Sequence, residues 1–163
     1  MVMMYLTDEL VRSLERKFEI KVMSQCELRE FLDENIAEYG KEFPMICYEH
    51  TDDSNIEVGF DESKFLNDKA HEGTWIVGFN YSEAIFIMCL KDDENELCID
   101  ALEVANSERL NKIAEYVLDD VEYVASKYFD GVYISPFDTS AMNFWEHMGY
   151  KEDYGGYYTK KFI

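Results

Sequence analysis

The sequence predicts an α/β (α+β) domain built on a mixed, mostly antiparallel sheet. Residues 74–104 hold three successive strand patterns joined by short polar turns, which is typical of an antiparallel meander. Residues 110–128 then repeat apolar side chains at helical spacing. A further strand pattern follows at 132–137, so the helix is a crossover and the strands on either side of it should be parallel.

One domain comprising residues 1–163 is expected. A chain of this length can bury a core, and 47% hydrophobic with 15% aromatic residues is a folding composition. No internal repeat and no linker rich in Pro, Gly or Ser divides the chain. No apolar run approaches the roughly 20 residues that span a bilayer, and the first residues lack the pattern of a signal peptide. We therefore expect a cytoplasmic protein that does not enter a membrane.

The first 40 residues predict two helices with a strand near 19–23 between them. Thr7 is expected to cap the first helix. The apolar side of that helix comprises Leu10, Val11, Leu14 and Phe18. Ser24 and Glu27 have the spacing of a capping box, and the helical pattern that follows is expected to end at Gly40.

The remaining segments differ in how clearly they can be assigned. Residues 41–72 allow only a short strand at 45–49 and a short helix at 62–66. Nearer the C-terminus, residues 140–150 predict a short amphipathic helix with Gly149 at the C′ position. A last strand at 156–162 is expected to close the chain.

The net charge of −20 is the strongest global feature. It argues against a nucleic-acid partner, because phosphates attract clustered Lys and Arg. A basic ligand is easier to accommodate, although acidic residues also simply keep a protein soluble. The acidic segments 51–55 and 91–96 lack the ligand and glycine spacing of an EF-hand and are interpreted as solvated turns. Neither metal-ligand spacing nor a disulfide pattern is evident for Cys26, Cys47, Cys89 and Cys98, so we expect free thiols and no metal.

Two segments of the C-terminal half carry recognisable motifs. Residues 138–150 read DTSAMNFWEHMGY. This resembles the segment N-x-x-A-x-x-hydrophobic-Y-E-x-x-G-F of the GNAT family, the Gcn5-related N-acetyltransferases, with Asp138 replacing the usual Asn and Trp145 the usual Tyr. The order of the predicted elements resembles that family as well. The resemblance implies a GNAT-like sheet with helices on both faces, in which the parallel fourth and fifth strands, here 96–104 and 132–137, splay apart.

Residues 109–114, RLNKIA, are similar to the pyrophosphate loop of that family, Q/R-x-x-G-x-G/A. Lys112 stands where the first glycine belongs. In such a loop, backbone N–H groups at a helix N-terminus face the phosphates of the cofactor, and glycine permits the close approach. The charges of Arg109 and Lys112 could instead reach phosphate oxygens directly. Asn106 is a good N-cap that could start the helix early, whereas the resemblance requires residues 105–110 to stay in a loop.

The resemblance also implies acetyl-CoA as the cofactor and a cationic amine as the acceptor. In the family, the splayed strands expose backbone groups that hold the pantetheine arm and polarise the thioester; here the Val104 amide is the expected contact and a backbone donor of this kind could form an oxyanion hole. The candidate cofactor-binding residues are Leu102, Val104, Ala105, Arg109, Leu110, Asn111, Lys112, Ala114, Asp138, Ala141, Phe144 and Trp145. Core packing is the alternative for Phe144 and Trp145.

The attacking amine must lose a proton, and the candidate catalytic residues are Glu103, Asp100 and Tyr133. Burial raises the pKa of a carboxyl group, which suits a base near neutral pH. Glu103 is favoured because it lies closer to the splay, and a solvated or salt-bridged side chain is the alternative. Strict alternation would place Glu103 and Asp100 on opposite faces of their strand. Tyr133, a phenol with an ordinary pKa of about 10, is better suited to packing or to orienting a substrate.

The proton donor is the point at which the chain departs most from the family. An indole N–H at Trp145 donates a hydrogen bond but does not readily give up its proton. The tyrosines that could replace the usual one are Tyr150, Tyr157 and Tyr158. Two functions are therefore compatible with the sequence: an acetyl-CoA-dependent N-acetyltransferase for a cationic small molecule or a basic protein, or a GNAT-fold binding module that has lost catalysis. A homodimer is compatible with both.

Overall fold

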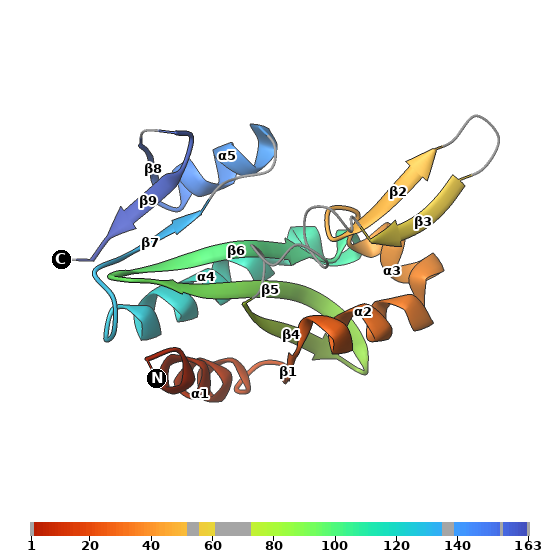
Figure 1. The fold of residues 1–163 in the computed structure, drawn as a ribbon, viewed down its shortest axis with the longest axis horizontal. Helices are drawn as coiled ribbons and strands as arrows, with labels where there is room; N and C mark the ends of the chain where they lie inside the picture. The colour runs from red at the N-terminus through yellow and green to blue at the C-terminus, as the bar shows by residue number, and fades with distance from the viewer. Residues whose placement is uncertain (1, 52–55, 61–72, 135–138, 154, 163) are drawn as a thin grey trace.

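The computed structural model describes residues 2–51, 56–60, 73–134, 139–153 and 155–162. Its main sheet has seven strands in the spatial order β1, β4, β5, β6, β7, β9 and β8 (Figure 1). The strands are β1 (Glu19–Met23), β4 (Thr74–Asn80), β5 (Glu83–Asp93), β6 (Glu96–Val104), β7 (Gly131–Ile134), β8 (Lys151–Glu152) and β9 (Tyr158–Lys161). Neighbouring strands pair antiparallel except β6 and β7, which are parallel. The predicted mixed, mostly antiparallel sheet with a parallel crossover is confirmed.

Helices cover both faces of this sheet, as the resemblance implied. On one face, α1 (Val2–Leu14) and α4 (Ile113–Ala125) bury their apolar sides in a first core together with Ile99 and Val104 of β6. On the other face, α2 (Gln25–Glu34) and α3 (Ile36–Glu42) form a second core with Ala101. Each core removes apolar side chains from water, which is the main favourable contribution to folding.

The N-terminal helix starts earlier than predicted. It begins by Val2, so Thr7 lies inside the helix and the predicted N-cap is wrong. Its fully buried side chains are Leu6, Leu10 and Leu14. This spacing of four residues extends the apolar side of the helix one turn toward the N-terminus.

The second helical region is two helices rather than one. The predicted capping box is confirmed, because Ser24 Oγ accepts from Glu27 N–H and a Glu27 carboxylate oxygen accepts from Ser24 N–H, both at 3.1 Å. The predicted end at Gly40 is wrong. The backbone breaks at Asn35 (φ −132°, ψ 43°), and Gly40 is buried inside α3.

The middle of the chain forms a separate hairpin of β2 (Cys47–Thr51) and β3 (Ile56–Phe60). The hairpin projects from the end of the molecule at which β6 ends (Figure 1). The strand predicted at 45–49 therefore begins two residues later. The helix predicted at 62–66 lies outside the described residues.

The last helix, α5 (Thr139–His147), ends as predicted at Gly149, which has φ +91°. Tyr150 N–H donates to Trp145 C=O and Gly149 N–H donates to Glu146 C=O, each at 3.0 Å, and this pattern is a Schellman motif. The rings of Trp145 and Tyr150 lie 5.0 Å apart and add the apolar contact typical of that motif. The final strand is shorter than predicted, and β8, which pairs with it, was not predicted.

None of the helices in the described part of the chain is long and apolar enough to cross a bilayer. The four cysteines are free. Among the described residues, no group of three His, Cys, Asp or Glu side chains is arranged to hold a metal ion.

Candidate functional site

Strand β6 continues past its described pairing with β7. Among the described residues, the parallel pairing reaches Ile99 and Ile134, and β6 runs on to Val104 while paired with β5. Past Ile99, the edge of β6 on the β7 side has no ladder partner among the described residues. Residues 135–138, which follow β7, lie outside the described residues, and the splay that the resemblance implied stays a prediction.

The backbone of Val104 is directed toward this edge. Ala105 N–H donates to Ile85 C=O of β5 at 2.8 Å. In an antiparallel strand, alternate residues direct their N–H and C=O groups to the same neighbouring strand. Ala105 bonds to β5, so the N–H and C=O groups of Val104 and Leu102 point away from β5. The Val104 N–H is therefore directed away from β5, and its role as a contact of the cofactor stays a prediction.

A short 3₁₀-helix, η3 (Asn106–Asn111), leads from β6 to Lys112 and then to α4. Lys112 has left-handed backbone angles, φ 57° and ψ 29°, which glycine adopts at the lowest cost. The lysine thus adopts, at the glycine position of the motif, a backbone conformation that costs glycine least. It supplies no side-chain cap to α4. The segment after Ala105 is neither an open loop nor an early start of α4, and Asn106 begins only the 3₁₀ turn.

Glu103 is the buried polar residue of this region, with an exposed fraction of 6%. Its two carboxylate oxygens accept the N–H groups of Met45 and Ile46, each at 2.9 Å. The guanidinium of Arg109, whose side chain is about half exposed, lies 3.8 Å from the same carboxylate. Burial raises the pKa of Glu103 to about 7, although the two N–H donors and Arg109 lower it.

Asp100 lies on the same face of β6 as Glu103, so the prediction of opposite faces is wrong. The register shifts there, because Cys89 pairs with Ala101 while Leu90 pairs with Ile99, and this leaves Asp100 as an extra residue in a β-bulge. After the bulge, Ala101 joins the second core although Ile99 belongs to the first. Asp100 is partly exposed and its carboxylate lies 3.8 Å from Lys91 Nζ.

Tyr133 is directed away from the end of β6. Its hydroxyl donates to an Asp93 carboxylate oxygen, near the turn that joins β5 to β6. Burial, together with hydrogen bonds to Asp93 and Cys98, raises the pKa of the phenol. Tyr133 is not brought together with Glu103, and its raised pKa keeps the phenol protonated near neutral pH, so it is poorly suited to accept a proton.

Trp145 is a core residue rather than an exposed site residue. It is 4% exposed and packs against the rings of Phe144 and Tyr150 at centroid distances of 5.1 and 5.0 Å. Of the tyrosines that could replace the usual proton donor, Tyr150 and Tyr158 donate to Glu122 and Glu146. Burial raises the pKa of both phenols, and Tyr157 is exposed.

The other predicted cofactor-binding residues are spread over different environments. Ala105 is buried in the second core, and Leu102 and Ala114 pack against the first. Leu110 is 96% exposed, and Asn111 donates to Glu108. Asp138 lies outside the described residues, and Ala141 is described only as part of the α5 backbone.

Sequence reasoning missed the residues that fix the segment 41–46 against β6 and η3. Besides the Glu103 bonds, Asn106 donates through its side-chain amide to Lys41 C=O, and Ser107 donates through N–H and Oγ to Glu42 at 3.0 and 2.8 Å. These contacts join residues about 60 positions apart. No local spacing signals them, because backbone acceptors and donors carry no sequence signature.

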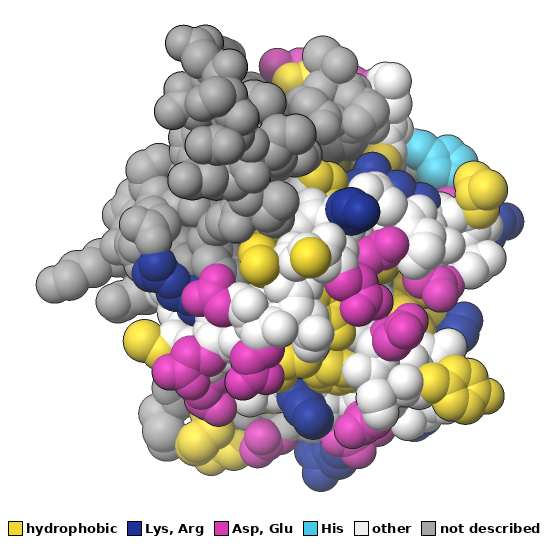
Figure 2. Space-filling model, turned by 90° about the vertical axis from the view of Figure 1, so that its right-hand side faces the viewer, with side chains coloured by type: hydrophobic (Ala, Val, Ile, Leu, Met, Phe, Trp, Pro, Cys, Tyr) yellow, Lys and Arg dark blue, Asp and Glu magenta, His cyan; other side chains and the backbone are white. Residues whose placement is uncertain are grey.

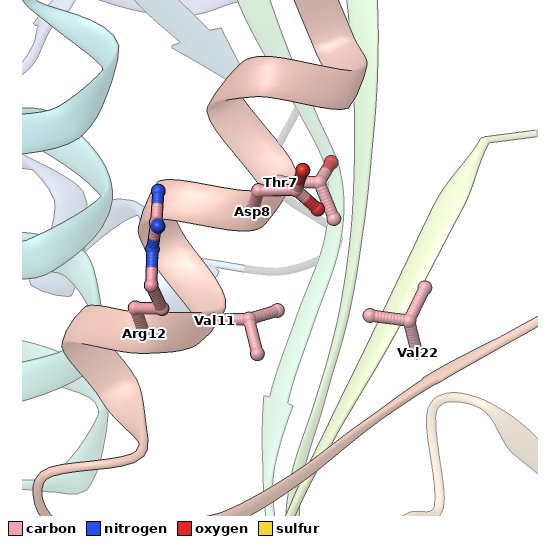
Figure 3. Close-up of a pocket in the computed structure, with 5 residues that line it drawn as sticks. All are labelled: Thr7, Asp8, Val11, Arg12 and Val22. Atoms are coloured by element: carbon pink, nitrogen blue, oxygen red, sulfur yellow. The ribbon is translucent and has the colours of Figure 1, made fainter.

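A shallow groove lies between α1 and the edge strand β1, lined by Thr7, Asp8, Val11, Arg12 and Val22 (Figure 3). Since β1 and β7 are separated by three strands in the sheet, this groove is remote from the predicted splay. At the end of the molecule where β2 and β3 lie, acidic side chains are scattered over the surface with lysine and arginine between them (Figure 2).

No protein-family model and no curated protein matches this sequence. Solved structures share its fold. A GNAT-family acetyltransferase from Staphylococcus aureus Mu50 is 20% identical with a TM-score of 0.55, covering 88% of this chain and 99% of its own. A Bacillus anthracis protein assigned as a streptothricin acetyltransferase, in complex with acetyl coenzyme A, is 13% identical (TM-score 0.54; 90% and 99% covered). The Escherichia coli protein YhhK, assigned as an N-acetyltransferase and bound to coenzyme A, is 14% identical (TM-score 0.56; 90% and 99% covered). This chain therefore has the GNAT fold.

Proposed function

We propose that this protein is an acetyl-CoA-dependent N-acetyltransferase that acts on the primary amine of a cationic small molecule or of a basic protein. One observation carries the proposal: β6 runs on to Val104 past Ile99, its last described pairing with β7, and the Val104 N–H is directed away from β5, toward the β7 side of the sheet. Two proteins of the same fold support the choice of cofactor, since one is bound to acetyl coenzyme A and the other to coenzyme A. The net charge of −20 favours a cationic acceptor.

The residues at the end of β6 fit a CoA thioester. The first turn of α4 offers backbone N–H groups without a side-chain cap, and a helix N-terminus favours phosphate. Arg109 and Lys112 add positive charge close to that turn. When bound, acetyl-CoA supplies an activated acetyl group. The Val104 N–H would hold the acetyl oxygen and stabilise the negative charge that develops on it.

Among the three candidate catalytic residues, Asp100 is the best placed to accept the proton of the amine. It lies in the β-bulge directly after Ile99, the last residue of β6 in the described pairing with β7, and its side chain is partly exposed. Both oxygens of Glu103 already accept backbone N–H groups, and Tyr133 donates to Asp93. We assign the base to Asp100 and a holding role to Glu103.

The second candidate function is a GNAT-fold binding module without turnover. The specific observation in its favour is Trp145, which is buried in the core at the position where the family motif has tyrosine. The acidic side chains of Glu108 and Glu115 also flank Lys112 in sequence and oppose the binding of phosphate there.

The test is transfer of a radiolabelled acetyl group from acetyl-CoA to a panel of amines comprising polyamines, aminoglycosides and lysine-rich peptides. We expect transfer to at least one of these, and we expect Asp100→Asn to lower kcat more than it changes KM. Glu30→Gln, an exposed carboxylate change on α2, is the matched control and should leave the rate unchanged. Binding of acetyl-CoA without transfer to any amine would favour the binding module.

A further inference from the structure

Glu103 lies between two segments that the sequence places far apart. On one side, its carboxylate accepts the backbone N–H groups of Met45 and Ile46. On the other side, it faces the guanidinium of Arg109 in η3 at 3.8 Å. A buried carboxylate is stable only while such partners compensate for its lost hydration, so the three groups depend on one another.

Arg109 connects this buried cluster with the surface. Its side chain is about half exposed and belongs to the turn that precedes the N-terminus of α4. The Arg109 guanidinium can stay beside Glu103 or turn outward to a phosphate. If it turns outward, its 3.8 Å distance to the Glu103 carboxylate increases. Glu103 would then be left with neutral backbone donors alone, and a buried charge without its cation is costly.

We propose that Glu103 is a positioning residue which, through Arg109, links the phosphate-binding turn to Met45 and Ile46, so that a bound CoA molecule loosens these two residues of the segment 41–46. The inference deepens the proposed function and rests on it. Additional contacts hold the same segment, because Asn106 and Ser107 bind Lys41 and Glu42. Their presence confines the loosening to Met45 and Ile46. The structure thus places an element that responds to cofactor directly beside the end of β6.

The experiment measures amide hydrogen exchange by NMR in the full-length protein, with and without saturating CoA. In the ligand-free protein, Arg109→Ala should speed the exchange of Met45 and Ile46 by about tenfold, since a charge-assisted network loses its cation. Saturating CoA should speed the same two amides in the wild type and leave them unchanged in Arg109→Ala. The Phe43 amide, which donates to Tyr39 C=O, is the internal control and should not respond.

Arg16→Ala removes the same charge from an exposed position after α1 and should leave all of these amides unchanged. CoA that binds, as judged by calorimetry, without speeding Met45 and Ile46 would overturn the link. Unchanged exchange in ligand-free Arg109→Ala would overturn the positioning role of Glu103. Absence of CoA binding would overturn the proposed function as well as the link to CoA, while the ligand-free comparison still decides whether Arg109 supports the Glu103 contacts.

Discussion

Lys112 stands at the glycine position of the motif and adopts a backbone conformation that costs glycine least. Its backbone lies in the left-handed region, at φ 57° and ψ 29°, where a side chain costs about 1–2 kcal/mol. The position was predictable because RLNKIA could be compared with the family loop. The backbone angles were not, since lysine by itself favours a right-handed helix.

Replacing Lys112 by glycine should stabilise the fold. Glycine removes the strain of the left-handed angles but adds about 0.5–1 kcal/mol of backbone entropy to the unfolded chain, so we expect a net gain of roughly 0.5–1 kcal/mol. Urea denaturation gives the free energy of unfolding. Lys112→Ala is the control, because it removes the charge and keeps the strain. Equal stability of the two variants would contradict the account.

Glu103 should make the stability depend on pH. Its pKa is about 7 in the folded protein and ordinarily 4.5, so folding takes up a proton between these values. The stability contributed by this group is complete below pH 4.5 and is lost as pH rises through 7. We compare the free energy of unfolding of the wild type with that of Glu103→Gln. The wild-type value minus the variant value should therefore fall by about 3 kcal/mol from pH 4.5 to 8.

Urea denaturation at several pH values measures this difference. Glu30→Gln, an exposed change on α2, controls for the general effect of losing a negative charge from an acidic protein. If the difference in free energy of unfolding between the wild type and Glu103→Gln stays constant from pH 4.5 to 8, Glu103 does not bind a proton on folding.

At the scale of elements, α5 was predicted well because its ending is local. Gly149 permits the left-handed turn at φ +91°, and Tyr150 closes the motif onto Trp145, which lies on the preceding part of the same helix. A Cβ at Gly149 would meet no atom closer than Lys160 Nζ at 3.5 Å, so only backbone strain opposes a side chain there.

Gly149→Ala should therefore destabilise the protein by about 1–2 kcal/mol. The thermal midpoint and the free energy of unfolding in urea measure the loss. Gly149→Asn should cost less, because asparagine tolerates left-handed angles. If alanine and asparagine cost the same, crowding rather than backbone strain would be the cause.

Other elements could not be read from local pattern. Asn35 breaks the second helical region although the apolar spacing continues through it, because the chain turns to place Tyr39 and Phe43 in the second core. The bulge at Asp100 depends on the register with β5, which no property of β6 alone determines. Because of that one extra residue, Asp100 lies on the face of β6 opposite to the predicted one.

At the scale of the whole molecule, the sequence predicted the meander, the crossover helix and the mixed sheet but neither β8 nor the partners of the site residues. The meander, the crossover and the Gly149 ending are each carried by contiguous residues. The contacts of Glu103 with Met45 and Ile46 join segments 57 and 58 residues apart, and they depend on tertiary folding. This is why Glu103 was predicted as a base, whereas its observed partners suit a residue that holds the chain.

The central claim, that the end of β6 and the N-terminus of α4 bind a CoA thioester, is tested most directly by calorimetric titration with acetyl-CoA at physiological ionic strength. The account predicts roughly micromolar binding, weakened at least about tenfold in an Arg109→Ala, Lys112→Ala double variant that loses two phosphate contacts. An Arg16→Ala, Lys151→Ala variant loses the same charge from exposed positions after α1 and on β8 and should bind as the wild type does. No detectable heat at millimolar acetyl-CoA, or equal weakening in both double variants, would contradict the claim.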